Sequence, residues 1–280
     1  GLGAGIGLVL VAAIICWCSK NRRDNRKNNI DPMSKAGGGR RESTTAAEVS
    51  LQPMPDKRKP TLVTDGIMAV LEHKKITPFD LKKDVVYGTE VGSGAFGQVF
   101  KAKLSTTDCA IKQLHKHDNK STALLAGLLE EFDVMMQLRH PNVLLTMGIA
   151  VDKNSLTTGI VMEYMQASLF DVIYEPTFAP YRTWDSAYFA IASDVAKGMS
   201  FIHFNGLLHR DLKPGNVLLD GQWVAKVADF GNALDDAHTN VHEIAGTPPY
   251  MAPEIILAHT YDRPVDVWAF GCIVAHMASG

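Results

Sequence analysis

A glycine-rich segment that runs into an alternating strand is the feature that most restricts the fold of this 280-residue chain. The segment GSGAFGQV, residues 92–99, contains Gly92, Gly94 and Gly97, and the missing Cβ atoms allow its backbone to approach phosphate oxygens. In a dinucleotide-binding fold such glycines open a helix, whereas Gly97 here begins QVFKAKL, which alternates like a strand. We therefore predict a strand-loop-strand lid over phosphates, with a plain glycine hairpin as the alternative.

The segments around this lid predict an α+β fold. DVVYGTEVG, QVFKAKL and TDCAIKQL alternate like three consecutive strands, STALLAGLLEEFDVMMQLRH has helical spacing, and VLLTMGIAV and GIVMEYM look like two more strands. Beyond residue 167 the chain becomes helical, most clearly at DSAYFAIASDVAKGMSFIHFNG and PVDVWAFGCIVAHMA. A five-stranded sheet with one helix is therefore expected to precede a mainly helical part.

Lys112 stands at the end of an apolar strand, in CAIK. A lysine that points inward needs an anionic partner, and Glu131 on the following helix is a candidate. A solvated lysine at a strand end is the alternative interpretation.

Two further segments concentrate polar groups. In LLHRDLKPGN, residues 207–216, Pro214 and Gly215 favour a tight loop before the short apolar run NVLLD, so its polar groups are expected at a cleft edge. A charged, solvated loop is the alternative. In VADFGNA, residues 227–233, Asp229 leaves an apolar strand and can bind a hard cation, with Asn216 as a second oxygen ligand. Hard cations beside phosphates indicate Mg²⁺ with a nucleotide.

These segments, in this order, resemble the eukaryotic protein kinase family. The motifs are GSGAFGQV, AIK at 110–112, HRDLKPGN at 209–216, DFG at 229–231, APE at 252–254 and DVWAFG at 266–271. The resemblance covers about residues 84–280 and implies a two-lobed fold, with an N-lobe at about 84–165 and a C-lobe at about 166–280 within a domain assigned to 80–280. The family's last helices would follow Gly280, so we interpret the chain as a fragment with an incomplete C-lobe.

The resemblance implies ATP and Mg²⁺ as cofactors and a role for each matched residue. The three lid glycines would cover the phosphates, and Lys112 would hold them while paired with Glu131, which fits the family spacing better than Glu130. Asp211 would accept the substrate hydroxyl proton, and Lys213 would lie by the transferred phosphate. Asn216 and Asp229 would bind Mg²⁺. The adenine would lie among Val99, Ala110, Met162, Glu163, Met165 and Leu218.

The same resemblance bears on substrate and regulation. DLKPGN and GTPPYMAPE are similar to serine/threonine kinases, in which the lysine at Lys213 bonds a threonine such as Thr247, and RHPNVLLTMGIA is similar to the tyrosine-kinase-like group. Protein Ser/Thr hydroxyls are therefore the expected substrates, and a nucleotide-binding pseudokinase or scaffold is the alternative. Arg210 is expected to be an uncompensated cation that a phosphate on Thr239 would pair with. The alternatives are that Asp235, Asp236 and Glu243 supply the negative charge themselves, and that Thr239 is a solvated loop residue with no role. Cys109 replaces the family's usual valine and would add a thiol near ATP.

The first 18 residues carry no charge and reach the length of a membrane span. Lys20, Arg22, Arg23, Arg26 and Lys27 follow, against the single acidic residue Asp24, and this order predicts a single-pass protein with the kinase domain in the cytoplasm. A buried core helix is the alternative. Gly3 and Gly7 form a GxxxG pattern that could pair two copies in a homodimer, although small residues are also simply tolerated in lipid.

Composition and charge indicate the nature of the segment before the kinase domain and exclude some partners. Residues 19–79 begin with the basic cluster and continue rich in Gly, Ser, Thr, Pro and charge, which predicts a disordered juxtamembrane linker. A short helix across DGIMAVLEHKK, near the end of this segment, is the alternative. The net charge of -2 gives no basic footprint for nucleic acid. The four cysteines are too scattered for a disulfide framework or a zinc site.

Overall fold

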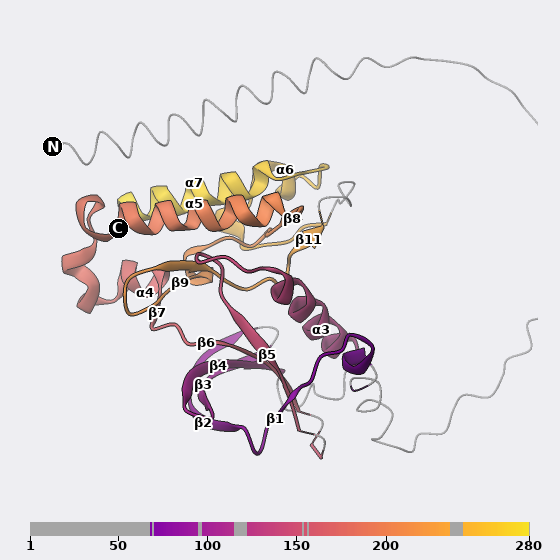
Figure 1. The fold of residues 1–280 in the computed structure, drawn as a ribbon. Helices are drawn as coiled ribbons and strands as arrows, with labels where there is room; N and C mark the ends of the chain where they lie inside the picture. The colour runs from indigo at the N-terminus through magenta and orange to yellow at the C-terminus, as the bar shows by residue number, and fades with distance from the viewer. Residues whose placement is uncertain are drawn as a thin grey trace, which may run out of the picture.

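Figure 1 shows a computed structural model of the chain, which describes residues 68, 70–94, 97–114, 122–152, 154–155, 157–235 and 243–279. The predicted span at residues 1–18 and the predicted phosphorylation site at Thr239 lie outside these residues. Within the described ranges, no helix has both the length and the apolar character needed to cross a membrane.

The N-lobe is a twisted antiparallel sheet with one parallel strand added at its edge. Its strands lie in the order β1-β5-β6-β4-β3-β2. The strands are Phe79–Asp80 (β1), Val85–Gly94 (β2), Gly97–Leu104 (β3), Thr107–Gln113 (β4), Thr146–Val151 (β5) and Thr158–Glu163 (β6). The five strands from β2 to β6 confirm the predicted sheet. Most of β5 and β6 is continuously buried, whereas only Gly97 and Ala102 are buried in β3, which reflects the more central position of β5 and β6 in the sheet.

The ordered fold begins upstream of where the sequence placed it. We expected a disordered linker up to residue 79 and a five-stranded sheet, but Phe79–Asp80 form a sixth strand, parallel to β5. A helical turn at 70–73 precedes it, and its Leu71 is only 1% exposed. A two-residue strand has no periodicity to detect. Leu71 lies in the segment DGIMAVLEHKK, for which a short helix is the alternative interpretation, and the helical turn at 70–73 agrees with that alternative.

The helix α3, Thr122–Gln137, packs against the sheet and contributes one apolar side to the core. Leu125, Leu128, Phe132 and Met135 are each at most 5% exposed and belong to the main cluster of buried side chains. Their spacing of three and four residues produces the buried stripe. Glu131 lies on the same helix and is also buried, which requires a charged partner.

The C-lobe is mainly helical, as predicted. Its helices are Leu169–Tyr174 (α4), Phe189–Phe204 (α5), Pro253–Ile256 (α6) and Pro264–Ser279 (α7). Its short strands are Ala167–Ser168 (β7), Leu207–Leu208 (β8), Val217–Leu219 (β9), Ala225–Val227 (β10) and Leu234–Asp235 (β11). The helices α5 and α7 run alongside each other, and β9 and β10 lie between them and the N-lobe (Figure 1).

The segment between α3 and β5 joins the lobes by backbone hydrogen bonds. The Leu144 N–H donates to the Val227 carbonyl at 2.9 Å, and the Val227 N–H donates to the Asn142 carbonyl at 3.0 Å. Gly198 on α5 allows this approach, because a Cβ there would lie 2.4 Å from the Asn142 carbonyl oxygen. Strand β10 and the Asp229 that follows it are thereby held against the N-lobe.

Candidate active site

Lys112 on β4 meets two carboxylates that come from different lobes. Its Nζ lies 2.7 and 2.8 Å from the two Glu131 carboxylate oxygens and 2.9 Å from Asp229 Oδ1. Its side chain is 13% exposed, and that of Glu131 is 5% exposed. The predicted Lys112–Glu131 contact is confirmed, and so is the preference for Glu131, since Glu130 is exposed.

Burial and charge act against each other in this cluster. Burial alone would lower the pKa of Lys112, but the carboxylates of Glu131 and Asp229 outweigh it and raise that pKa above its usual value. Burial would likewise raise the pKa of Asp229, but the ammonium of Lys112 outweighs it, so that the pKa is lowered. Lys112 is therefore a cation and Asp229 an anion at neutral pH, as binding of phosphate and of a divalent metal ion requires.

The glycine-rich segment joins β2 to β3, which confirms the predicted strand-loop-strand arrangement. That this loop covers phosphates stays a prediction. Gly92 pairs with Val99 and Gly94 with Gly97, while residues 95 and 96 lie outside the described ranges. Gly97 has a φ of +146°, and a Cβ there would lie 1.9 Å from the Gln113 carbonyl oxygen. Only glycine fits this turn into β3.

The side chains expected around the adenine lie in one continuous apolar cluster. The cluster includes the buried Ala110 and Met162 and, packed against it, the partly buried Val99, Met165 and Leu218. Cys109 belongs to a different cluster, together with Ile111 and Val161, and is 0% exposed. Because neighbouring residues of β4 point to opposite sides of the sheet, the thiol faces away from Ala110, and our expectation of a thiol near ATP is wrong.

The loop after β8 places a carboxylate, an ammonium and a hydroxyl in direct contact. Thr247 Oγ1 donates to Asp211 Oδ1 at 2.6 Å, and Lys213 Nζ donates to Asp211 Oδ2 at 2.7 Å and to Thr247 Oγ1 at 2.9 Å. This geometry confirms the predicted bond between Lys213 and Thr247. Asp211 is buried and held on both carboxylate oxygens, so its orientation is determined before a substrate arrives.

Asn216 and Asp229, the predicted metal ligands, come from adjacent segments. The Asn216 amide nitrogen donates to the Asp211 carbonyl at 2.8 Å, which leaves its side-chain oxygen as the group that can accept or bind a cation. The Ala228 N–H donates to the Asn216 carbonyl at 2.9 Å and so brings the residue before Asp229 next to Asn216. An amide oxygen and a carboxylate suit Mg²⁺, which takes few protein ligands beside water and phosphate oxygens. Among the described residues, no group of three or more His, Cys, Asp or Glu side chains is arranged to bind a metal ion.

Asp266 on α7 holds the backbone that leads to Asp211. Its carboxylate accepts hydrogen bonds from the His209 N–H, the Arg210 N–H and the His203 Nε2, each at 2.8 Å. Arg210 has a φ of +65°, an uncommon conformation for a residue with a side chain, and the bond to Asp266 holds it there. The sequence analysis used DVWAFG only as a family motif and missed this role of Asp266.

Arg210 is not the uncompensated cation that the sequence analysis expected. Its side chain lies 3.0 Å from a Glu243 carboxylate oxygen, donates to the Tyr261 hydroxyl at 3.1 Å and donates to the Asn232 carbonyl at 2.6 Å. Glu243 is one of the three acidic residues considered as alternative sources of this negative charge, and the contact confirms that alternative. A carboxylate therefore already occupies the place in which we expected the phosphate of Thr239.

A second charged pair was not predicted. Glu163, at the end of β6, accepts hydrogen bonds from the Leu145 N–H at 2.7 Å and from Lys226 Nζ at 2.8 Å on both carboxylate oxygens. Lys226 belongs to β10 in the C-lobe, so this pair joins the lobes beside their connection. The Glu163 side chain is thus engaged, and its backbone N–H donates to the Leu145 carbonyl at 3.0 Å. A contact of Glu163 with adenine stays a prediction.

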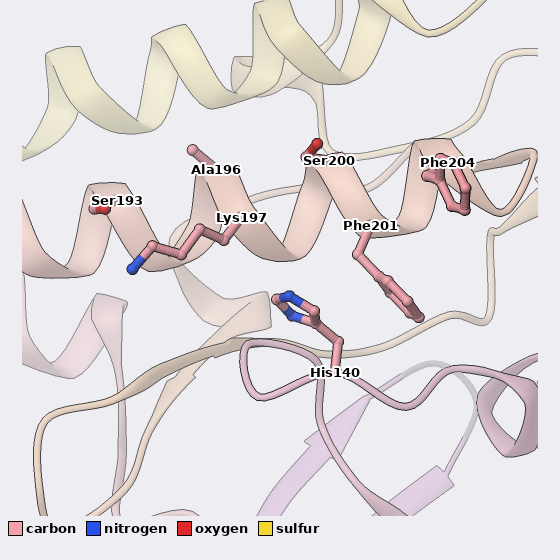
Figure 2. A pocket seen from close by; sticks show the side chains of 7 residues that line it. All are labelled: His140, Ser193, Ala196, Lys197, Ser200, Phe201 and Phe204. Atoms are coloured by element: carbon pink, nitrogen blue, oxygen red, sulfur yellow. The ribbon is translucent and has the colours of Figure 1, made fainter.

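A separate surface hollow contains none of these groups. Figure 2 shows it along α5, where the His140 and Phe201 rings stack at 4.9 Å between centroids and Lys197 and Phe204 lie further along the helix. The Phe204 side chain is 87% exposed. The His140 ring faces α5 from the side of that helix opposite α7 (Figure 2).

The two-lobed fold thus carries a glycine-rich hairpin, a buried lysine paired with carboxylates and an oriented aspartate. Residues 85–280 match the family described as the protein kinase domain. The chain belongs to the protein kinase family.

The relatives that it matches are serine/threonine kinases. It is 33% identical to the serine/threonine-protein kinase CTR1 of Arabidopsis thaliana, over 81% of this chain and 27% of that protein. It is 37% identical to the serine/threonine-protein kinase Tao of Drosophila melanogaster, over 68% of this chain and 18% of that protein. The chain thus spans about a quarter or less of the length of these two relatives.

Proposed function

We propose that this protein is a serine/threonine protein kinase that transfers the γ-phosphate of ATP to serine and threonine hydroxyls of proteins. The observation that carries the proposal is the contact of Thr247 with both Asp211 and Lys213. It resembles the arrangement of serine/threonine kinases and orients a base and a cation toward one point. The names of the matched relatives agree with this substrate class.

In the proposed reaction Asp211 accepts the proton of the substrate hydroxyl. The hydroxyl oxygen forms a bond to the γ-phosphorus, the bond from that phosphorus to the bridging oxygen breaks, and ADP leaves. Lys112, held by Glu131, positions the ATP phosphates, and Lys213 lies where charge on the transferred group can be neutralised. Asn216 and Asp229 would bind Mg²⁺, which when present neutralises phosphate charge.

We expect the protein to transfer radiolabelled phosphate from ATP to serine- and threonine-containing peptides and not to the same peptides with tyrosine in their place. The reason is the contact of Thr247 with Asp211 and Lys213, which resembles the arrangement of serine/threonine kinases. Acid-stable label on serine and threonine, identified after hydrolysis, is the measurement. Label on tyrosine alone would contradict the substrate class. ATP binding without any transfer would instead favour the pseudokinase alternative.

We further propose that the kinase belongs to the tyrosine-kinase-like group and is anchored in a membrane by residues 1–18. The support for the group is the segment RHPNVLLTMGIA. The support for the anchor is the uncharged run itself and the basic cluster from Lys20 to Lys27 that follows it.

The membrane anchor predicts a single orientation. In sealed vesicles whose cytoplasmic side faces outward, added protease should cleave the linker and release the kinase domain into solution, since the basic cluster keeps that side cytoplasmic. Immunoblotting of the supernatant measures the release, and vesicles opened with detergent are the control for protease access. A linker that is protected until detergent is added would contradict the orientation, and a domain that stays soluble without protease would contradict the anchor.

A further inference from the structure

Residues 70–80 lie outside the range that matches the protein kinase domain, yet they pack on its core. Leu71 is 1% exposed and belongs to the same buried cluster as Leu125, Leu128 and Phe132 of α3. Its neighbour Val70 is 39% exposed, so only one side of the turn faces the core. A leucine buried to this extent contributes appreciably to holding together the elements around it.

An ion pair connects the same segment to α3. Lys74 Nζ is bonded to the carboxylate of Asp133, 59 residues further along the chain. Asp133 is two positions after Glu131 on α3, and both side chains of the pair are partly exposed. A pair this exposed adds little stability, but it places the turn beside the part of α3 that carries Glu131 (Figure 1).

The segment is also fixed at its other end. Strand β1 pairs with β5, and the Leu81 N–H donates to the Val151 carbonyl at 3.2 Å. The Phe79 ring packs so closely on Gly148 that a Cβ there would lie 2.7 Å from the ring. The segment therefore links two elements that do not follow it directly in the chain, the edge of the sheet and α3.

We propose that residues 70–80 form a docking segment that holds α3 where Glu131 reaches Lys112, with Leu71 and Lys74 as positioning residues. The inference rests on the proposed kinase function for its effect on catalysis. Glu131 touches Lys112 at 2.7 Å, and a shift of α3 by about an ångström breaks such a contact and misplaces the lysine that positions phosphate. Leu71 shares its packing with the buried side of α3, so its removal loosens that helix first.

A double-mutant cycle in the full chain separates positioning from general stability. Leu71→Ala should lower kcat/KM about ten-fold, whereas in a chain that already carries Glu131→Gln it should lower kcat/KM less than about two-fold, because the contact it supports is gone. The matched control is Val70→Ala on the exposed side of the same turn, which should leave kcat/KM unchanged. Equal losses in both backgrounds would overturn the proposal, since a merely structural leucine costs the same in each.

Hydrogen exchange measured by mass spectrometry tests the docking without relying on catalysis. Leu71→Ala should speed exchange of the α3 amides and leave those of α5 unchanged, and Lys74→Glu should have a smaller effect of the same kind. Adding Asp133→Lys to Lys74→Glu reverses both charges of the ion pair and should restore slow exchange of the α3 amides. This test can still be made if Leu71→Ala fails to fold. If these substitutions leave the exchange rate of the α3 amides unchanged, the docking proposal is wrong, whether or not the chain transfers phosphate. An α3 response in a chain without transfer supports the docking and contradicts only the proposed function.

Discussion

Replacing Asp211 by asparagine should lower the rate of phosphate transfer roughly a thousand-fold, within the range that a positioned general base contributes. Asparagine has the same shape but cannot accept the proton of the substrate hydroxyl. Its amide nitrogen would also face the Lys213 ammonium or the Thr247 hydroxyl, both of which now donate to the carboxylate. ATP affinity should change less than about two-fold, because Lys112, which is expected to bind the phosphates, lies in a separate cluster.

Single-turnover kinetics and equilibrium ATP binding, measured on the same preparation, distinguish the two effects. Asp185→Asn, at an exposed aspartate of the same lobe, is the matched control and should retain the normal rate. An Asp211→Asn protein with wild-type turnover would refute the proposed mechanism. Equal losses of turnover and of ATP affinity would mean that Asp211 supports the nucleotide site and is not the base.

Asp266→Asn should lower the free energy of unfolding by about 3–5 kcal/mol, the usual range when one partner of a buried charged network is removed. One of its two carboxylate oxygens becomes an NH₂ group that faces backbone N–H or histidine donors. An NH₂ group in place of Oδ2 leaves the His209 N–H and His203 Nε2 without their acceptor, and one in place of Oδ1 leaves the Arg210 N–H without it, in a site that is 1% exposed. Either change disturbs the backbone beside Arg210, which has a positive φ, so activity should fall together with stability.

The same variant should change how stability depends on pH. Burial alone would raise the pKa of Asp266, but the hydrogen bond from His203 and the other donors outweigh it, so that the folded-state pKa lies below the ordinary value. A lowered pKa gives stability that is fully present above the unfolded-state pKa, about 4, and is lost as the pH falls through the folded-state value. Urea unfolding of both proteins between neutral pH and pH 3 should show their difference shrinking at the acid end. Asp262→Asn, at an exposed position, is the control, and a difference that does not depend on pH would contradict the assignment.

The sequence predicted the parts of the site that lie within motifs or between motifs of fixed spacing. Glu131 could be preferred to Glu130, and Thr247 could be assigned to Lys213, because the family resemblance relates those positions. The lid could be predicted from physical grounds, since glycines that lead into an alternating strand permit few structures.

The remaining contacts depend on residues far apart in the chain and outside any periodic pattern. Glu163 meets Lys226 only after the whole domain has folded, so their charges looked independent in the sequence. Glu243 is a candidate source of charge for Arg210, but the sequence could not choose it over Asp235 and Asp236. A short helix around Leu71 is the alternative to a linker, but the burial of Leu71 depends on tertiary packing that no local rule reveals. Composition describes the average of a segment, whereas docking here depends on one side chain.

The orientation of Cys109 has a consequence for chemical probes of this protein. Electrophilic ATP-competitive compounds need a thiol that both lines the nucleotide cleft and ionises readily. Cys109 does neither, because it is 0% exposed in the cluster on the other side of the sheet and burial raises the pKa of its thiol. Covalent selectivity therefore has to come from a cysteine introduced elsewhere in the cleft, and Cys109 can remain in place during such labelling without becoming a background site.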